Sequence, residues 1–210
     1  MGITFFKTME QQKSLKEIAD EVMKIKGNVK GEAIRTDFIY VLEKKGEEGI
    51  RLIEEKYKQL GYEFKFKDIK SFGWYPESYS VLLSLIIMDV FGWTEKDIFE
   101  MGNCSPKYSF IVRTILHYFV SVDMVFKEVP VYWKKHYDFG EIEAVELNKI
   151  EKYLVFRVKD YKFHPIMCIY QSGYFLRIGQ YSIQSPKITV EELKCVFKGA
   201  PYHEYRLSWK

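Results

Sequence analysis

Cysteine is scarce in this sequence of 210 residues, and its scarcity excludes one class of protein. Only three cysteines are present, Cys104, Cys168 and Cys195. Three thiols cannot build the disulfide framework that stabilises small secreted proteins. We therefore expect a reducing environment, which predicts a cytoplasmic location.

Long hydrophobic runs are also missing. The most apolar stretch covers residues 81–88, where Ser84 interrupts it and Asp89 ends it. A helix that spans a membrane needs about 20 consecutive apolar residues. The first six residues are followed by the charged residue Lys7, and they lack the regions of a signal peptide. The sequence therefore predicts no membrane span.

An excess of charge of one sign is absent as well. The 32 basic and 29 acidic residues leave a net charge of +3, so no strong field for nucleic acid is evident. Apolar residues make up 47% of the chain, which is enough for a packed core. Aromatic residues reach 17%, and such rings fill a thick core or line an apolar pocket.

Sequence motifs of common enzymes are missing too. There is no GxxxxGK phosphate loop, no GxGxxG fingerprint, no GxSxG nucleophile elbow and no HExxH zinc helix. The four histidines are His117, His136, His164 and His203, and no two of them have the helical spacing of metal ligands. Nothing local favours an enzyme, and we predict no catalytic residue.

The first 140 residues show helical periodicity, with apolar residues recurring every three or four positions. The expected helices cover residues 14–25, 33–42, 49–60, 76–90, 94–102, 105–119 and 121–137. Thr94 and Asp97 resemble a capping box, and the helix that they begin is expected to end near Gly102. Pro130 is expected to kink or divide the last helix.

The period changes after Gly140. The expected elements are strands at 142–148 and 153–158, a helix from 164 to about 178, and strands at 188–197 and 202–209. This order predicts an α+β fold, in which N-terminal helices pack on a small antiparallel sheet of β-β-α-β-β order. We expect one domain over residues 1–210, with a helical part over about 1–140 and a sheet part over about 141–210.

Cysteine and histidine flank the last predicted turn, at residues 198–201. If the hairpin pairs around this turn, Cys195 and His203 lie opposite each other with Cβ atoms about 4.5–5.5 Å apart. A thiolate and an imidazole so placed can chelate a zinc ion. The candidate ligands are Cys168, Cys195, His203 and a carboxylate of the first hairpin, either Glu146 or Glu143. The alternative is an unmetallated pair of buried cysteines beside an exposed histidine.

The residues around these cysteines resemble a known family. Cys168 is followed, after four residues, by Gly173-Tyr174, and Cys195 precedes the turn Gly199-Ala200-Pro201 and a strand of alternating aromatic residues. This pattern is similar to the 4-vinyl reductase domain family. Its members carry a helix Cys followed by Gly-Tyr, and a last hairpin with Cys, Gly-Asp and a second Cys.

The resemblance implies a zinc site with ligands on Cys168, Cys195 and His203 and near Glu146. Two departures from the family pattern occur in the last hairpin. His203 stands where the family has its last Cys, which preserves zinc chemistry, and the Gly-Asp turn has lost its carboxylate.

Earlier residues resemble the wider superfamily of ligand-binding domains in nitric-oxide signalling and Golgi transport. Its Gly, Tyr-Pro, Leu-Gly and Pro-x-x-Trp features match Gly31-Glu32-Ala33, Tyr75-Pro76, Met101-Gly102 and residues 130–133. Its haem-propionate motif, Tyr-x-Ser-x-Arg, is similar to the segment that starts at Tyr170. Tyr174 occupies the position of the Arg, which argues against haem.

The resemblance implies a stand-alone, sensor-like domain that binds a hydrophobic or aromatic small molecule in an apolar pocket. We expect the pocket to be lined by Tyr79, Leu83, Phe110, Phe126, Trp133 and Tyr170. The signal would pass to a partner protein or through a homodimer formed by helix 14–26. Two alternatives stay open: an interaction subunit similar to the TRAPP-like, Golgi-tethering branch, and a haem- or tetrapyrrole-related protein.

Overall fold

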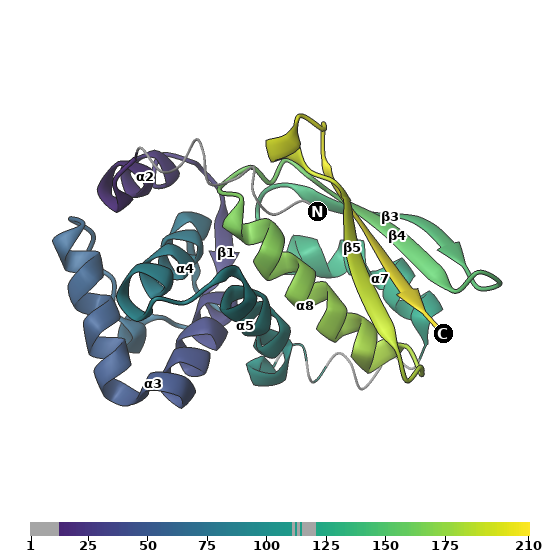
Figure 1. The fold of residues 1–210 in the computed structure, drawn as a ribbon, viewed down its shortest axis with the longest axis horizontal. Coiled ribbons are helices and arrows are strands. Elements are labelled where there is room, and N and C mark those ends of the chain that lie inside the picture. The colour runs from purple at the N-terminus through teal and green to yellow at the C-terminus, as the bar shows by residue number, and fades with distance from the viewer. Residues whose placement is uncertain (1–12, 111, 113, 115–120) are drawn as a thin grey trace.

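The computed structural model describes residues 13–210, apart from residues 111, 113 and 115–120, as an α+β fold (Figure 1). Its helices are α2 (Leu15–Val22), α3 (Gly31–Gln59), α4 (Glu77–Phe91), α5 (Glu95–Tyr108), α7 (Val122–His136) and α8 (Ile166–Ser182). Its strands are β1 (Asn28–Lys30), β2 (Trp74–Pro76), β3 (Glu141–Asn148), β4 (Tyr153–Lys159), β5 (Ile188–Lys194) and β6 (His203–Trp209). The predicted fold class is confirmed.

The main sheet has the strand order β3-β4-β6-β5, and every neighbouring pair is antiparallel. Helix α8, which connects β4 to β5, lies across one face of this sheet (Figure 1). Phe175 of α8 meets Phe156 of β4 with 4.4 Å between ring centroids, and Tyr205 of β6 contacts both rings. The β-β-α-β-β order of the C-terminal part is therefore as predicted.

A second, two-stranded sheet lies in the N-terminal half. Strand β1 pairs with β2 through Val29 and Tyr75, and Val29 also forms a bridge to Tyr137, which follows α7. We expected strands only beyond Gly140, and that expectation was wrong. Strands of three residues are too short to show an alternating pattern in the sequence.

Helices α5 and α8 cross at close range because each has a glycine at the contact. A Cβ atom on Gly102 would lie 2.1 Å from the backbone oxygen of Tyr170, and one on Gly173 would lie 2.0 Å from that of Phe99. Gly102 thus allows close packing and does not end its helix. Contrary to expectation, α5 continues through Pro106 to Tyr108. The predicted capping box at its start, made by Thr94 and Asp97, is confirmed.

Two helix-breaking residues, Gly46 and Pro130, have different effects on their helices. Gly46 has a φ of 67° and bends α3, so the predicted break between two helices is confirmed. Pro130 lies inside α7, which runs unbroken from Val122 to His136 while it packs along β3. The proline therefore does not divide this helix.

Helix α2 packs on α4 of its own chain. Its residues Ala19 and Val22 are buried, and the Tyr62 hydroxyl donates a hydrogen bond of 2.6 Å to Asp20. The apolar stripe that we expected at a dimer interface is thus covered within one chain, so the homodimer stays a prediction without this support. Across the described part of the chain, no helix combines the length and apolarity needed to cross a membrane.

Candidate functional site

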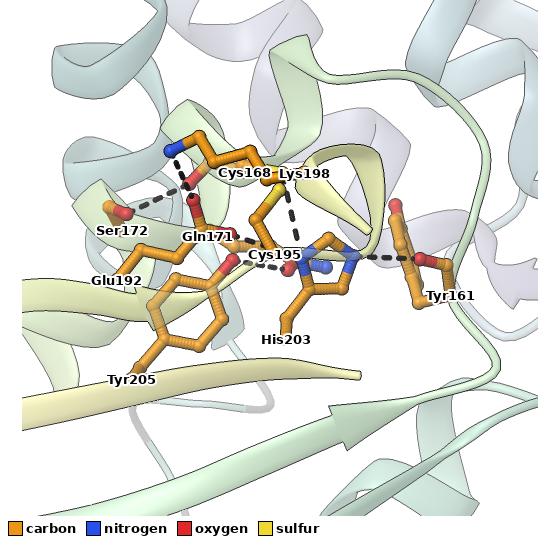
Figure 2. Close-up of polar contacts among 9 residues, drawn as sticks. All are labelled: Tyr161, Cys168, Gln171, Ser172, Glu192, Cys195, Lys198, His203 and Tyr205. Carbon is orange, nitrogen blue, oxygen red and sulfur yellow. Dashed lines mark hydrogen bonds and ion pairs between the residues drawn. The ribbon is translucent and has the colours of Figure 1, made fainter. Parts of the chain in front are cut away.

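Four potential metal ligands meet where α8 begins and the β5–β6 hairpin turns (Figure 2). Cys168 lies in the first turn of α8, Glu192 on β5, Cys195 just after β5, and His203 at the start of β6. Their ligand atoms, one from each residue, all lie within 4.8 Å of one another. The structure therefore brings together three of the four predicted ligands.

The distances within this cluster suit a small tetrahedral ion. Ligands that bind one zinc ion at about 2.0–2.3 Å lie about 3.3–3.8 Å from one another. The Cys168 sulfur lies 3.6 Å from the Cys195 sulfur and 3.7 Å from Nδ1 of His203. Both thiols are free and buried, since a disulfide needs a separation of about 2.05 Å.

A second contact fixes the imidazole of His203. Its Nε2 lies 2.9 Å from the backbone oxygen of Tyr161, which can only accept a hydrogen bond. The proton therefore sits on Nε2, and Nδ1 faces the cluster with a lone pair when the ring is neutral. Nδ1 lies 3.0 Å from Oε1 of Glu192. This is the orientation that a metal-ligating histidine requires.

The electrostatics of the cluster favour a cation. A hydrogen bond from the Cys168 thiol lowers the pKa of Cys195 to about 5, while this contact and burial raise the pKa of Cys168. Burial alone would lower the pKa of His203, but Cys195 and Glu192 raise it to about 9. Burial opposes ionisation of Glu192, yet His203 keeps the pKa of that carboxyl below its ordinary value. Two negative groups against one positive group leave a net negative site.

The carboxylate in this cluster belongs to Glu192, and the predicted placement of Glu146 or Glu143 beside the cysteines was wrong. Both predicted residues lie on β3, the strand at the opposite edge of the sheet from β5. There Glu146 accepts a hydrogen bond from Tyr153, and Glu143 pairs with Lys159 at 3.2 Å.

A β-bulge explains why Glu192 was missed. Side chains three positions apart on a regular strand point to opposite faces, which separates Glu192 from Cys195. The register between β5 and β6 shifts between Glu192 and Lys194. A bulge reverses the alternation and turns Glu192 toward the cluster. The only signal in the sequence is an acid three residues before Cys195.

A cavity of about 140 Å³ lies among α3, α5, α7 and α8. Its lining is mostly apolar and aromatic and includes two of the predicted residues, Trp133 and Tyr170. The Trp133 indole donates a hydrogen bond of 3.0 Å to the backbone of Phe139, and the Tyr170 hydroxyl donates one of 2.6 Å to Asp37. Both side chains are therefore held in place at the cavity wall.

The other four predicted lining residues lie elsewhere. Tyr79 stacks on Phe64, with ring centroids 4.2 Å apart, and Leu83 is fully buried in α4. Phe110 is 73% exposed, and Phe126 lines a separate void of about 30 Å³ beneath the sheet. Helical periodicity predicted the inward position of Tyr79 and Leu83 but not that of Phe110, and it did not show which inward residues line the same cavity.

Comparisons with known proteins identify a fold and no close relative. No protein-family model matches the chain, and no curated protein matches it. Solved structures do match. An H-NOX protein from S. oneidensis in the Fe(II)NO ligation state aligns with a TM-score of 0.67 at 14% identity, covering 86% of this chain and 99% of that one.

The fold is that of H-NOX domains.

Two further H-NOX structures support this. An oxygen-binding H-NOX domain related to soluble guanylate cyclases has a TM-score of 0.60 at 14% identity, covering 86% of this chain and 95% of that one. A structure from work on haem distortion in the H-NOX family has a TM-score of 0.62 at 15% identity, with the same coverage. Likeness at this identity shows the fold alone. This fold agrees with the fold that the resemblance above implied, while membership of the superfamily and of the 4-vinyl reductase family stays a prediction.

The expectation against haem was wrong. It depended on one residue, Tyr174, in place of an arginine, whereas these neighbours with the same fold are described with haem and with iron ligation states. One motif residue is too little to set aside a ligand that recurs in a fold. The comparisons give no support for zinc, which now depends on the geometry of the four-residue cluster.

Proposed function

We propose that this protein is a small-molecule sensor domain whose ligand occupies the 140 Å³ cavity. The observation that carries the proposal is an apolar cavity inside an H-NOX fold. An apolar cavity of about 150 Å³ binds benzene, so this one suits a ligand of that size. Ligand pockets combine apolar walls with a few polar groups, and here Glu32, Glu77 and His136 supply them.

Haem is a ligand that must be tested directly because the neighbours carry it. The described residues, as placed, do not fit it. A haem is several times larger than benzene, and its two propionates need cationic partners. No lysine or arginine is found among the described residues that line the cavity. Haem binding would require the cavity walls to move apart.

We propose that the cluster of Cys168, Glu192, Cys195 and His203 holds one structural zinc ion. Two thiolates, an imidazole and a carboxylate fill a tetrahedron and leave no open position, which is the arrangement of a structural site. The ion would fasten α8 to the β5–β6 hairpin. The support is the mutual distance of the four ligands and the fixed tautomer of His203.

Helix α8 connects the two sites. Its first turn carries Cys168, and the following turns carry Tyr170, Gln171 and Tyr174 of the cavity wall. The Tyr205 hydroxyl of β6 also donates a hydrogen bond of 3.1 Å to Gln171. A ligand that shifts α8 would therefore shift the hairpin, which is where we place the contact with a partner protein or a second chain.

Native mass spectrometry and ligand titration test the proposal. We expect about one zinc per chain on protein never exposed to chelator, and saturable binding of benzyl alcohol by calorimetry. Val129→Phe on α7 should fill the cavity and abolish this binding, because Val129 lines it. Val131→Phe, on the same helix, is the matched control because Val131 is 46% exposed.

The zinc site and the sensor cavity can be contradicted by separate results. Zinc content well under roughly 0.2 per chain would overturn the metal site. No binding of benzyl alcohol, no retained ligand and no Soret band on titration with haemin would together overturn the sensor and leave the interaction subunit. A Soret band that Val129→Phe removes would identify haem as the ligand of this cavity.

A further inference from the structure

We infer that the cavity selects small organic cations, namely a primary ammonium group on a benzene-sized apolar body, and that Glu77 is the residue that binds the ammonium. The inference rests on the proposed function, since it names the ligand class of the same cavity. Its support is an unpaired oxygen of a buried carboxyl group, a described lining without basic side chains, and the aromatic walls.

Glu77 has a buried oxygen without a partner. The residue is 1% exposed, stands in the first turn of α4 and lines the cavity. The Tyr161 hydroxyl donates a hydrogen bond of 2.5 Å to Oε1. Oε2 has no hydrogen-bond partner among the described residues. A buried polar atom without a hydrogen bond destabilises the folded state. A ligand that donates a hydrogen bond to Oε2 would remove this cost, which favours its binding.

The described cavity lining offers carboxyl groups and no lysine or arginine, which favours a cation over an anion. Glu32 and Glu77 both line the cavity, and Asp37 lies close enough to Glu77 to raise its pKa. Glu32 is already engaged, because its Oε1 accepts a hydrogen bond of 3.0 Å from the Phe110 backbone. His136 adds no opposing charge, since burial lowers the pKa of its imidazole. An anionic ligand would meet these carboxyl groups without a basic partner among the described lining residues.

Aromatic rings complete the site. The described lining contains the aromatic residues Tyr132, Trp133, Tyr137, Tyr161, Tyr170, Tyr174 and Phe175. The faces of such rings attract an organic cation, and the attraction grows when water is excluded. A carboxylate enclosed by aromatic rings recognises an amine through an ion pair at one end and apolar contact around the body.

Proton release accompanies binding in this scheme. Burial raises the pKa of Glu77 to about 8, and the groups that face it are Asp37 of α3, Tyr137 after α7 and Tyr161 before α8. The carboxyl is therefore protonated in the empty cavity at neutral pH. An ammonium ion that pairs with Oε2 displaces that proton to solvent, so affinity should rise between pH 6 and 8.

Calorimetric titration with three ligands of matched size tests the inference: benzylamine, benzyl alcohol and benzoate. We expect the wild type to bind benzylamine at least about tenfold more tightly than benzyl alcohol at pH 8, and benzoate more weakly than either. At pH 7, two buffers of different ionisation enthalpy should show release of close to one proton with benzylamine and none with benzyl alcohol.

Glu77→Gln keeps the size of the side chain and removes its charge. We expect it to weaken benzylamine binding by about tenfold or more and to leave benzyl alcohol within about threefold. Glu100→Gln, an exposed acid on α5, should change neither. Equal binding of benzylamine and benzyl alcohol to the wild type, without proton release, would overturn the inference while leaving the sensor cavity intact. Failure of all three ligands would also overturn the inference, and it would overturn the sensor as well if no retained ligand and no Soret band with haemin were found. The results with the wild type test the inference even if the variant fails to fold.

Discussion

Two buried carboxyl groups dominate the electrostatics of the core. Asp37 accepts a hydrogen bond from Tyr170 and Glu77 accepts one from Tyr161, and each keeps one oxygen without a partner among the described residues. Burial raises the pKa of each group to about 8. Protonation avoids the cost of a buried charge but makes the stability of the fold depend on pH.

Glu77→Gln should remove one pH-dependent contribution to stability. The folded wild type keeps the proton of Glu77 up to about pH 8, whereas the unfolded chain releases it near the ordinary pKa of 4.5. Stability is therefore lost as pH rises through this window. Relative to the variant, the free energy of unfolding of the wild type should fall by up to about 1.4 kcal/mol per pH unit between pH 5 and 8.

Urea unfolding of both proteins at several pH values measures this slope. Glu100→Gln, at an exposed position, should follow the wild type at every pH. A constant difference between the wild type and Glu77→Gln from pH 5 to 8 would show that Glu77 is ionised in the folded state throughout.

Residue patterns predicted part of the candidate metal site and missed the rest. The predicted hairpin register brought Cys195 opposite His203, and Lys194 does pair with Glu204, in that register. Glu192 escaped prediction because the bulge beside it has no signature in residue type. The unpaired oxygen of Glu77 escaped as well, since burial without a partner depends on packing between distant segments.

At the scale of elements, the crossing of α5 and α8 depends on the absence of two side chains. Gly173 approaches the backbone of Phe99, and Asn103 donates a hydrogen bond of 3.1 Å to the Gly173 carbonyl. The sequence predicted most helices because they have amphipathic faces. It misjudged the end of α5 because a glycine in contact with another helix is indistinguishable, in sequence, from a glycine that ends one.

Gly173→Ala should destabilise the protein, because its methyl group would overlap the backbone of α5. The expected cost is about 1–3 kcal/mol in the free energy of unfolding, as for other overpacked sites. Gly179→Ala, on the same helix, is the matched control. Its Cβ would make ordinary contacts of 3.5 Å, so higher helix propensity should leave stability equal or up to about 1 kcal/mol greater. Equal stabilities of the two variants would contradict the close crossing.

At the scale of the whole molecule, the C-terminal hairpin joins the rest of the fold through the pairing of β6 with β4 and the packing of α8 on β5. The sheet is covered by α8, and the turn between β5 and β6 reaches α8 through Cys168, Cys195 and His203 (Figure 2). A metal ion at this point would join residues from three separate elements. Because such a site forms only in the folded state, the free energy of metal binding would add to stability.

Cys195→Ser should therefore lose the metal and lower the thermal midpoint. A loss of about 3 kcal/mol corresponds to about 6–12 °C for a chain of this size. Cys104→Ser is the control, because Cys104 lies on α5 outside the cluster and should keep both the metal and the midpoint. Metal content by mass spectrometry and unfolding by calorimetry follow the two effects separately. A Cys195→Ser protein that keeps stoichiometric zinc would contradict the ligand assignment, whereas one that loses zinc without a change in midpoint would contradict the structural role.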